Sequence, residues 1–125
     1  MAGFSKWSPQ AYALMRIMFG LLFLCHGLSK LVGFPVPPPP GAAGPVVYAA
    51  GLIELVCGAL VAAGLFTRWA AFIASGQMAV AYFMVHFPRG FYPMINQGEL
   101  AVLYCFGFLL IATHGPGIWS VDQQI

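Results

Sequence analysis

The sequence predicts an all-α fold: an integral membrane bundle of four helices that run up-down-up-down. The first observation is composition, since 61% of the 125 residues are hydrophobic and only 6% are charged. A soluble domain carries about 25% charged residues, because water must wet its surface. The second observation is a series of long apolar runs, broken by proline, glycine or charged residues, which is typical of membrane spans. We therefore expect one transmembrane domain over 1–125, with helices near 10–32, 46–66, 69–87 and 98–114.

Charge and cysteine usage exclude several classes of partner. The formal net charge of +2 is small and dispersed along the chain, which argues against nucleic acid and leaves the lipid bilayer as the expected partner. Cys25, Cys57 and Cys105 form no CxxC pair and no metal-type cluster, so we interpret them as apolar fillers. The chain also lacks a nucleotide-binding loop and a histidine pair at matched depths. We expect no bound metal, haem or nucleotide.

The first apolar run, 10–32, carries the stripe around which the rest of the chain is organised. On an α-helix, at about 100° per residue, five of its residues share an arc of roughly 80°: Arg16, Gly20, Phe23, Gly27 and Lys30. A basic side chain that faces acyl chains is costly, so this stripe should face other helices and meet an acid there. Because leucine precedes Cys25 and no A-x-A site follows, we interpret the run as a retained first helix rather than a signal peptide.

A proline-rich connector separates the first helix from the second. Residues 34–45 read FPVPPPPGAAGP, which forbids a helix interior and predicts a stiff, extended spacer; a proline-rich recognition motif is the functional alternative. The second helix, 46–66, places an acid among small residues on one face: Gly51, Glu54, Gly58 and Ala62. Small residues let a neighbouring backbone approach closely, so we expect Glu54 to face the bundle interior.

The last two helices add one amide and one more acid. A very short turn at Thr67 and Arg68 makes the second and third helices antiparallel neighbours. Gln77 is the strongly polar member of an otherwise small or apolar face of the third helix. Glu99 opens the fourth helix, where it either joins the polar cluster or only complements the helix dipole. Four spans put both termini on one side, and the lysine and arginine count favours the cytoplasm.

These polar residues define the candidate intramembrane site, a cluster that we interpret as ligand-binding. Its members are Arg16, His26, Lys30, Glu54, Gln77 and Glu99. No residue stands out as catalytic. At about 1.5 Å per residue, most of them fall in the leaflet of the first and third loops, with Gln77 nearer the middle and Arg16 deeper still. On the helical wheel His86 lies opposite Gln77, and we leave it outside the cluster.

Charge pairing within the cluster follows from these depths. We expect Lys30 to pair with Glu99 near the membrane surface. Deeper in the bundle, we expect Glu54 to pair with His26 or Arg16. The alternative is that such buried pairs only lock the helices together and bind nothing.

Three stretches of the chain, taken in order, carry a family pattern. They are RIMFGLLFLCHGLSKLVGF, GLIELVCGALVAAGLFTRWAAF and GELAVLYCFGFLLIATHGPGIWSVD. Together they resemble the DoxX family of four-helix bacterial membrane proteins, from about residue 11 to residue 122. The positions that carry the resemblance are Arg16, Gly20, Gly27, Lys30, Glu54, Gly58, Gly64, Thr67, Arg68, Glu99, Ser120 and Asp122. The proline-rich connector is not part of that pattern.

The resemblance implies a multi-pass protein of the bacterial inner membrane. Related DoxD-type proteins are subunits of a thiosulfate:quinone oxidoreductase, and DoxX-like proteins are associated with membrane redox complexes. It therefore implies a membrane subunit of an oxidoreductase assembly, with protein partners and a polar site for a quinone or a small anion. A non-enzymatic binding or scaffold protein is the alternative. A small carrier is a third hypothesis, and it would need a homo-oligomer to provide alternating access.

Overall fold

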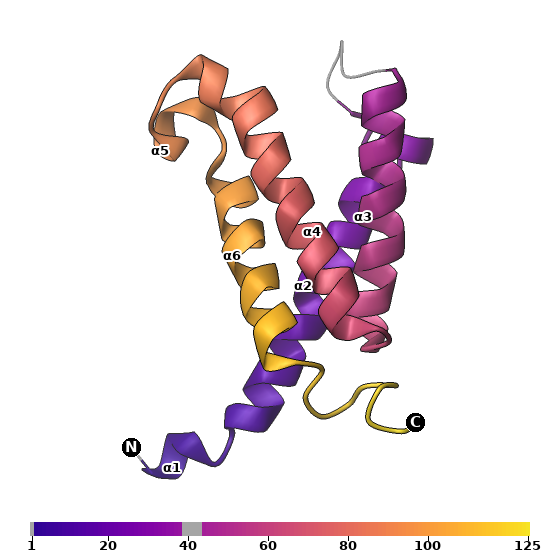
Figure 1. Ribbon diagram of the computed structural model, residues 1–125, viewed down its shortest axis with the longest axis vertical. Coiled ribbons are helices and arrows are strands. Elements are labelled where there is room, and N and C mark those ends of the chain that lie inside the picture. Colours follow the sequence, from indigo (N-terminus) through magenta and orange to yellow (C-terminus); the bar gives the residue numbers. More distant parts are fainter. Residues whose placement is uncertain (1, 39–43) are drawn as a thin grey trace.

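The computed structural model describes residues 2–38 and 44–125, and this part of the chain is helical without strands (Figure 1). The all-α class is thus confirmed. Six α-helices follow one another: α1 (Ala2–Ser5), α2 (Ser8–Val32), α3 (Pro45–Ala63), α4 (Thr67–Ala81), α5 (Pro93–Asn96) and α6 (Glu99–His114). Helix α4 continues into a π-helical turn, η1 (Tyr82–His86), and a 3-10 turn, η2 (Phe87–Arg89). The predicted spacer lies partly outside the described residues.

The long helices begin and end at residues suited to those positions. Pro9 stands in the first turn of α2 and Pro45 opens α3, where a missing backbone N–H costs nothing. Gly33 and Gly64 end the same two helices in the left-handed conformation, each with φ of 73°. Glycine adopts that conformation without steric cost. The sequence therefore determines both ends of α2 and α3 locally.

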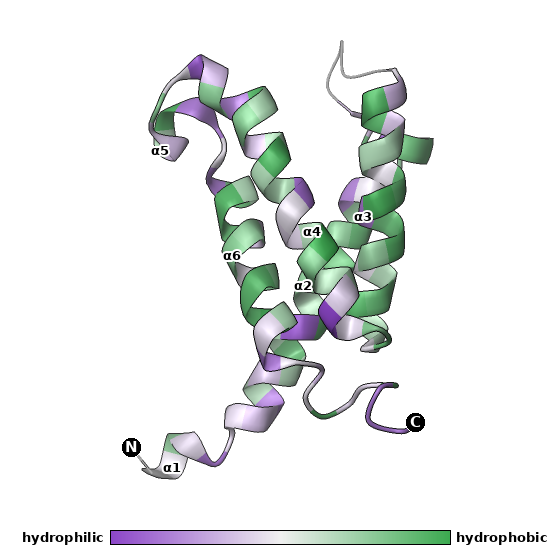
Figure 2. Cartoon of the chain, in the orientation of Figure 1, coloured by the Kyte–Doolittle hydropathy of each residue, from purple (hydrophilic) through white to green (hydrophobic). Residues whose placement is uncertain are grey.

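The surface of the helices is apolar and the buried charges lie inside. Helices α2 and α3 and the helical stretch 67–89 are each long and apolar enough to cross a bilayer, and α6 is shorter, with 16 residues. Figure 2 shows hydrophobic colouring along all four long helices. Large apolar side chains are exposed on them, including Leu14, Met18, Leu52, Val56, Phe72, Leu103, Phe106 and Leu110. Arg16 and Glu54 are buried, at 0% and 1% exposure. Lipid requires this distribution.

Helices α2 and α3 pack backbone against backbone through four glycines: Gly20, Gly27, Gly51 and Gly58. A methyl group added to Gly58 would lie 2.6 Å from the backbone nitrogen of Leu24. One added to Gly27 would lie 2.5 Å from the backbone nitrogen of Leu55. Backbone atoms cannot swing away as a side chain can, so both positions require glycine. This close approach brings the side chains of α2 within reach of those of α3.

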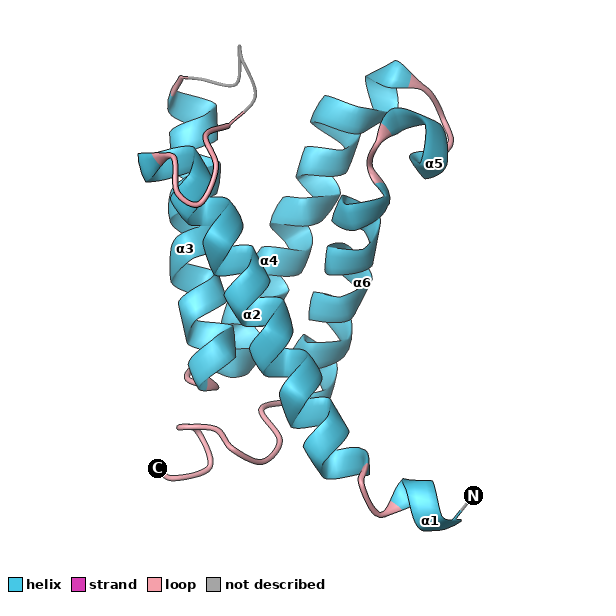
Figure 3. Ribbon diagram, turned by 180° about the vertical axis from the view of Figure 1, so that it is seen from behind, coloured by secondary structure: helices cyan, strands magenta, loops and turns pink. Residues whose placement is uncertain are grey.

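Helices α4 and α6 form the second pair, which Figure 3 shows beside the first. In their core α4 contributes small residues and α6 contributes large ones: Ala70, Ala71 and Ala74 with Tyr104, Phe108 and Ile111. The Ser75 hydroxyl donates to the carbonyl of Cys105 at 2.7 Å. Phe23 of α2 joins the two pairs, since its ring centroid lies 4.8 Å from that of Phe108 and 5.3 Å from that of Tyr104.

The C-terminal segment closes one end of the bundle around Arg16. The guanidinium donates to the carbonyls of Val61 at 2.8 Å and Ala62 at 3.0 Å, at the end of α3. It also donates to the carbonyls of Ile118 at 3.1 Å and Trp119 at 2.7 Å. The charge of the buried arginine is therefore stabilised by carbonyl dipoles of the α3 C-terminus and of the tail, and the side chain ties α2 to both.

Asp122 binds the tail to the start of α4. Its carboxylate accepts hydrogen bonds from the backbone N–H of Phe66 at 2.9 Å and from the N–H and hydroxyl of Thr67 at 3.0 and 2.7 Å. Burial alone would raise the pKa of the Asp122 carboxyl, but these hydrogen bonds and the charge of Arg16 outweigh it. The pKa lies below its ordinary value of 3.8.

Gly58→Ala tests the close packing of α2 on α3. The added methyl group meets backbone, so we expect a loss of about 1–3 kcal/mol in the free energy of unfolding. Gly76→Ala is the matched control, because a methyl group there meets nothing within 4 Å and alanine favours the helix by about 0.5–1 kcal/mol. Thermal unfolding in detergent measures both. Equal behaviour of the two variants would contradict the packing described.

Asp122→Asn tests the contact between the tail and α4. Loss of a helix N-terminal acceptor costs about 1 kcal/mol, so we expect a melting temperature a few degrees lower at neutral pH. The folded-state pKa is lowered, so the carboxylate contributes fully above the ordinary value of 3.8 and its contribution is lost as the pH falls through the folded-state pKa. The difference between variant and wild type should shrink over that interval. A difference independent of pH would show that the charge contributes nothing.

Candidate functional site

A cleft lies between the two helix pairs, toward the end of the molecule that carries the C-terminus of α2 and the N-terminus of α3. Its volume is about 530 Å³, which is within the range of roughly 300–1,000 Å³ found for pockets that hold small organic ligands. All four long helices line it. Most of the lining is apolar and includes Phe23, Val46, Ile53, Met78, Met84, Leu100 and Ala101. The polar residues of the lining are His26, Lys30, Glu54, Gln77, His86, Gln97 and Tyr104.

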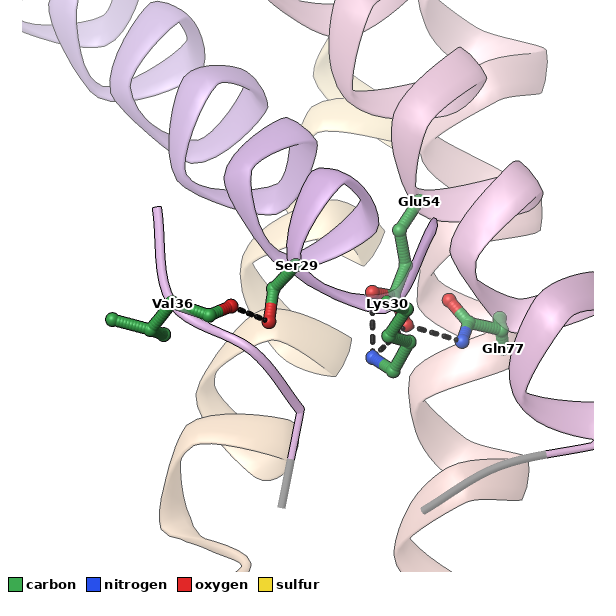
Figure 4. Close-up of polar contacts among 5 residues, drawn as sticks. All are labelled: Ser29, Lys30, Val36, Glu54 and Gln77. Carbon is green, nitrogen blue, oxygen red and sulfur yellow. Dashed lines mark hydrogen bonds and ion pairs between the residues drawn. The ribbon is translucent and has the colours of Figure 1, made fainter. Parts of the chain in front are cut away.

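Three helices meet at the Glu54 carboxylate inside this cleft (Figure 4). The Lys30 ammonium of α2 lies 2.7 Å from Oε1 and 2.8 Å from Oε2 of Glu54. The Gln77 amide of α4 donates to Oε2 at 2.9 Å. The glycines of the α2–α3 interface make this possible, because they bring the stem of Lys30 against α3. A buried charge is stable only when paired and hydrogen-bonded, and Glu54 meets both conditions.

The pair keeps hydrogen-bonding capacity for a further molecule. An ammonium has three donors, of which two point to Glu54, and the Lys30 side chain remains 30% exposed. His26 lines the cleft with its ring edge-on to Tyr104, at 5.9 Å between centroids. Tyr104 is buried but makes no hydrogen bond through its hydroxyl to the part of the chain that the structure describes. The inner end of the cleft thus offers donors to a ligand.

Gln77 has a fixed orientation. A carboxylate only accepts hydrogen bonds, so the Gln77 amide nitrogen must face Glu54. Its Oε1 is then directed elsewhere, and it is buried without a partner among the described residues. Such an acceptor costs free energy. The hydrogen bond of the Gln77 amide to Glu54 therefore stabilises the bundle, and the unpartnered Oε1 opposes it by a free energy of similar size.

The predicted pairings of the charged residues are wrong. Lys30 pairs with Glu54 rather than with Glu99, which is exposed in the first turn of α6. Neither His26 nor Arg16 pairs with Glu54. Arg16 hydrogen-bonds to backbone carbonyls at the opposite end of α3 instead. A basic residue at membrane depth needs a partner, but carbonyls at a helix end fulfil that need as well as an acid does.

The structure also adds three polar residues to the lining that the predicted cluster lacked: His86, Gln97 and Tyr104. His86, which we left outside the cluster, lines the cleft because it lies at the end of a π-helical turn. Such a turn inserts one extra residue and rotates the next residues of the helix by about 100° relative to the α-helical count. Its Nδ1 lies 3.1 Å from the carbonyl of Asn96. Tyr104 was missed because an isolated tyrosine in an apolar helix has no distinctive signal in sequence.

Comparison with known proteins agrees with this architecture. A sequence profile described as DoxX matches residues 11–87, more than half of the chain. The chain belongs to the DoxX family. The matched region contains all three helices that hold the Glu54 carboxylate, including Lys30 and Gln77.

Two of the three relatives compared with this DoxX protein are described as membrane proteins. The chain is 41% identical to an uncharacterized protein of Haemophilus influenzae, over 99% of this chain and 97% of that one. It is 27% identical to the uncharacterized membrane protein Rv3486 of Mycobacterium tuberculosis, over 94% and 82% of the two chains. It is 29% identical to the inner membrane protein YqjF of Escherichia coli, over 88% of each. No solved structure matches significantly. The chain is thus a membrane protein.

Lys30→Met tests the ion pair. Removing one partner leaves the Glu54 charge buried and unpaired, so we expect a loss of about 3–5 kcal/mol in the free energy of unfolding. In Lys30→Met/Glu54→Gln the charge is gone and the new amide can still accept from Gln77, so we expect most of the stability to return. Arg89→Met is the control, because Arg89 is exposed. Detergent melting temperatures decide; a double variant as unstable as the single one would contradict this account.

Proposed function

We propose that this DoxX protein is a membrane subunit of an oxidoreductase assembly and that its cleft binds the head of a lipid-soluble quinone. The observation that carries the proposal is the Lys30–Glu54 pair, which retains a free donor at the inner end of an apolar cleft. A few placed polar groups in an apolar pocket are typical of sites for small organic molecules. The inner membrane supplies quinones as such molecules.

The chemistry of the pair fits an uncharged carbonyl compound. Quinone carbonyls accept hydrogen bonds, and the remaining N–H of Lys30 can donate to one of them. Reduction to a quinol requires two electrons and two protons, and the electrons would come from a protein partner. As negative charge develops on the quinone oxygen, a fixed ammonium beside it is stabilising. His26 and Glu54 would exchange protons with the head.

A small anion fits this cleft less well. The charge of Lys30 is already neutralised by Glu54, and the second buried cation, Arg16, donates to four carbonyls at the other end of α3. An anion in the cleft would therefore meet a carboxylate without a net positive charge to balance it. Of the two ligand classes that the sequence left open, the geometry supports the quinone.

The membrane arrangement belongs to the same proposal. We place α2, α3, α4 with its following turns, and α6 across the bilayer, in alternating directions, with both termini in the cytoplasm. In support, the two termini lie at the same end of the molecule in Figure 1. Helix α6 packs extensively on α4 and exposes apolar side chains. A helix of 16 residues is about 24 Å long, and the flanking segments would complete the span.

Quinone binding by purified protein tests the function. Wild type in nanodiscs should retain more benzoquinone than empty nanodiscs at the same lipid concentration, as equilibrium dialysis measures. Lys30→Met/Glu54→Gln should lose about tenfold or more in affinity, because a charge-assisted hydrogen bond contributes roughly 1.5–3 kcal/mol. The melting temperature of the same sample shows that the double variant is folded.

The second hypothesis is that the pair only locks the helices together, and the burial of Glu54 supports that hypothesis. It predicts that the stable double variant retains full function in cells and that quinone affinity is unchanged or absent in both proteins. Unchanged affinity in the double variant would remove Lys30 and Glu54 from the binding site.

A further inference from the structure

The opening between α3 and α4 is a separate feature of the cleft. The Gln77–Glu54 hydrogen bond joins the two helices. Beyond it, toward the N-terminus of α3, that helix lines the cleft with apolar side chains: Val46, Val47, Ala49, Ala50 and Ile53. On the facing side, α4 and η1 contribute Val80, Ala81, Met84 and Val85, and His86 at the end of η1 is the polar member. Helix α3 also packs far less extensively on α4 than on α2.

This apolar wall continues onto the outer surface of the protein. Val46, Val80 and Met84 line the cleft and are 67%, 56% and 60% exposed. In a bilayer, side chains exposed at this depth contact acyl chains. The cleft therefore holds the ion pair of Lys30 and Glu54 at its inner end, and its α3 wall is apolar from there to the lipid. Two further polar residues of the lining, His86 and Gln97, come from η1 and from the segment before α6, so a hydrophilic solute on this path would still meet an apolar wall along α3.

We infer that the ligand of this cleft enters sideways from the bilayer between α3 and α4, and that it carries an aliphatic tail which stays in this opening. The inference rests on the proposed function and narrows it: the ligand class is an amphipathic lipid, with an uncharged hydrogen-bonding head at Lys30 and a tail along Val46 and Val80. The tail removes apolar surface of the opening from contact with mobile lipid, and the head satisfies the remaining donor of Lys30.

The test compares two probes with the same head. One is a decyl-substituted benzoquinone and the other is its methyl counterpart, each titrated into nanodiscs that contain the full chain. Ala49→Trp places an indole in the opening, at an exposed position that lines the cleft. Ala59→Trp is the matched control, because Ala59 is exposed on the same helix outside the cleft. Partitioning of each probe into lipid does not depend on the protein variant. We therefore compare, between variants, the ratio of the affinity for the decyl probe to the affinity for the methyl probe.

We expect Ala49→Trp to lower affinity for the decyl probe about tenfold, since excluding two methylene groups is worth roughly that factor. Affinity for the methyl probe should stay within twofold, and Ala59→Trp should match wild type for both probes. An Ala49→Trp variant that loses both probes equally, or neither, overturns sideways entry while leaving the quinone site in place. Wild type that binds neither probe overturns the proposed function as well.

Discussion

The structure depends on one requirement, which is that a carboxylate buried in an apolar bundle must be fully paired. Glu54 is 1% exposed and is held by Lys30 from α2 and by Gln77 from α4. Because lipid offers no hydrogen bonds, the three helices that supply these groups must approach one another closely. The glycines on α2 and α3 permit that approach, since their backbones touch where any side chain would hold them apart. The close packing of α2 on α3 and the charge pairing of Glu54 therefore depend on each other, and a substitution that disturbs one also disturbs the other.

The two inward-facing cations, Arg16 and Lys30, are stabilised in different ways. The difference indicates which of them has a structural role and which belongs to the candidate site. Arg16 uses two of its nitrogens on four backbone carbonyls, at the end of α3 and in the tail. That arrangement ties the tail to the bundle, and Arg16 is fully buried in it. Lys30 binds a single carboxylate, remains 30% exposed and lines the cleft. The Nε of Arg16 is also without a partner among the described residues, but it is buried. The spare donor of Lys30 faces the cleft, which is why the proposed site lies at that end.

Much of this could be predicted from the sequence, and the failures have physical causes. The stripe of Arg16 and Lys30 and the inward-facing Glu54 follow from periodicity, and the end of the first helix before Gly33 follows from local chemistry. The second helix was expected to reach residue 66, but it ends at Ala63 because Gly64 caps it in the left-handed conformation. The hydrogen-bond partners of Arg16 could not be predicted, because every residue has a backbone carbonyl and the sequence does not show which ones lie near the guanidinium. Lys30 pairs with Glu54 rather than with Glu99 because α2 lies very close to α3. The glycines in the sequence indicate that a close approach is possible, but they do not give the distance between the helices. His86 lines the cleft because a π-helical turn changes the direction in which the following side chains point. No residue in the sequence clearly predicts such a turn.

The position of the cleft follows from how the helices pair. Glycines join α2 to α3, and small residues on α4 receive the aromatic residues of α6. The contact between the two pairs is less extensive, and it depends on Phe23, the hydrogen bond from Gln77 to Glu54 and the tight turn between α3 and α4. A cleft lowers the free energy of unfolding least where few packing contacts are lost. A cleft between the two pairs therefore lowers it less than a cleft within either pair would. The same boundary contains the single carboxylate that all three neighbouring helices share. A molecule bound there would contact both pairs at once, and its binding energy would act on the one interface that the chain itself packs least.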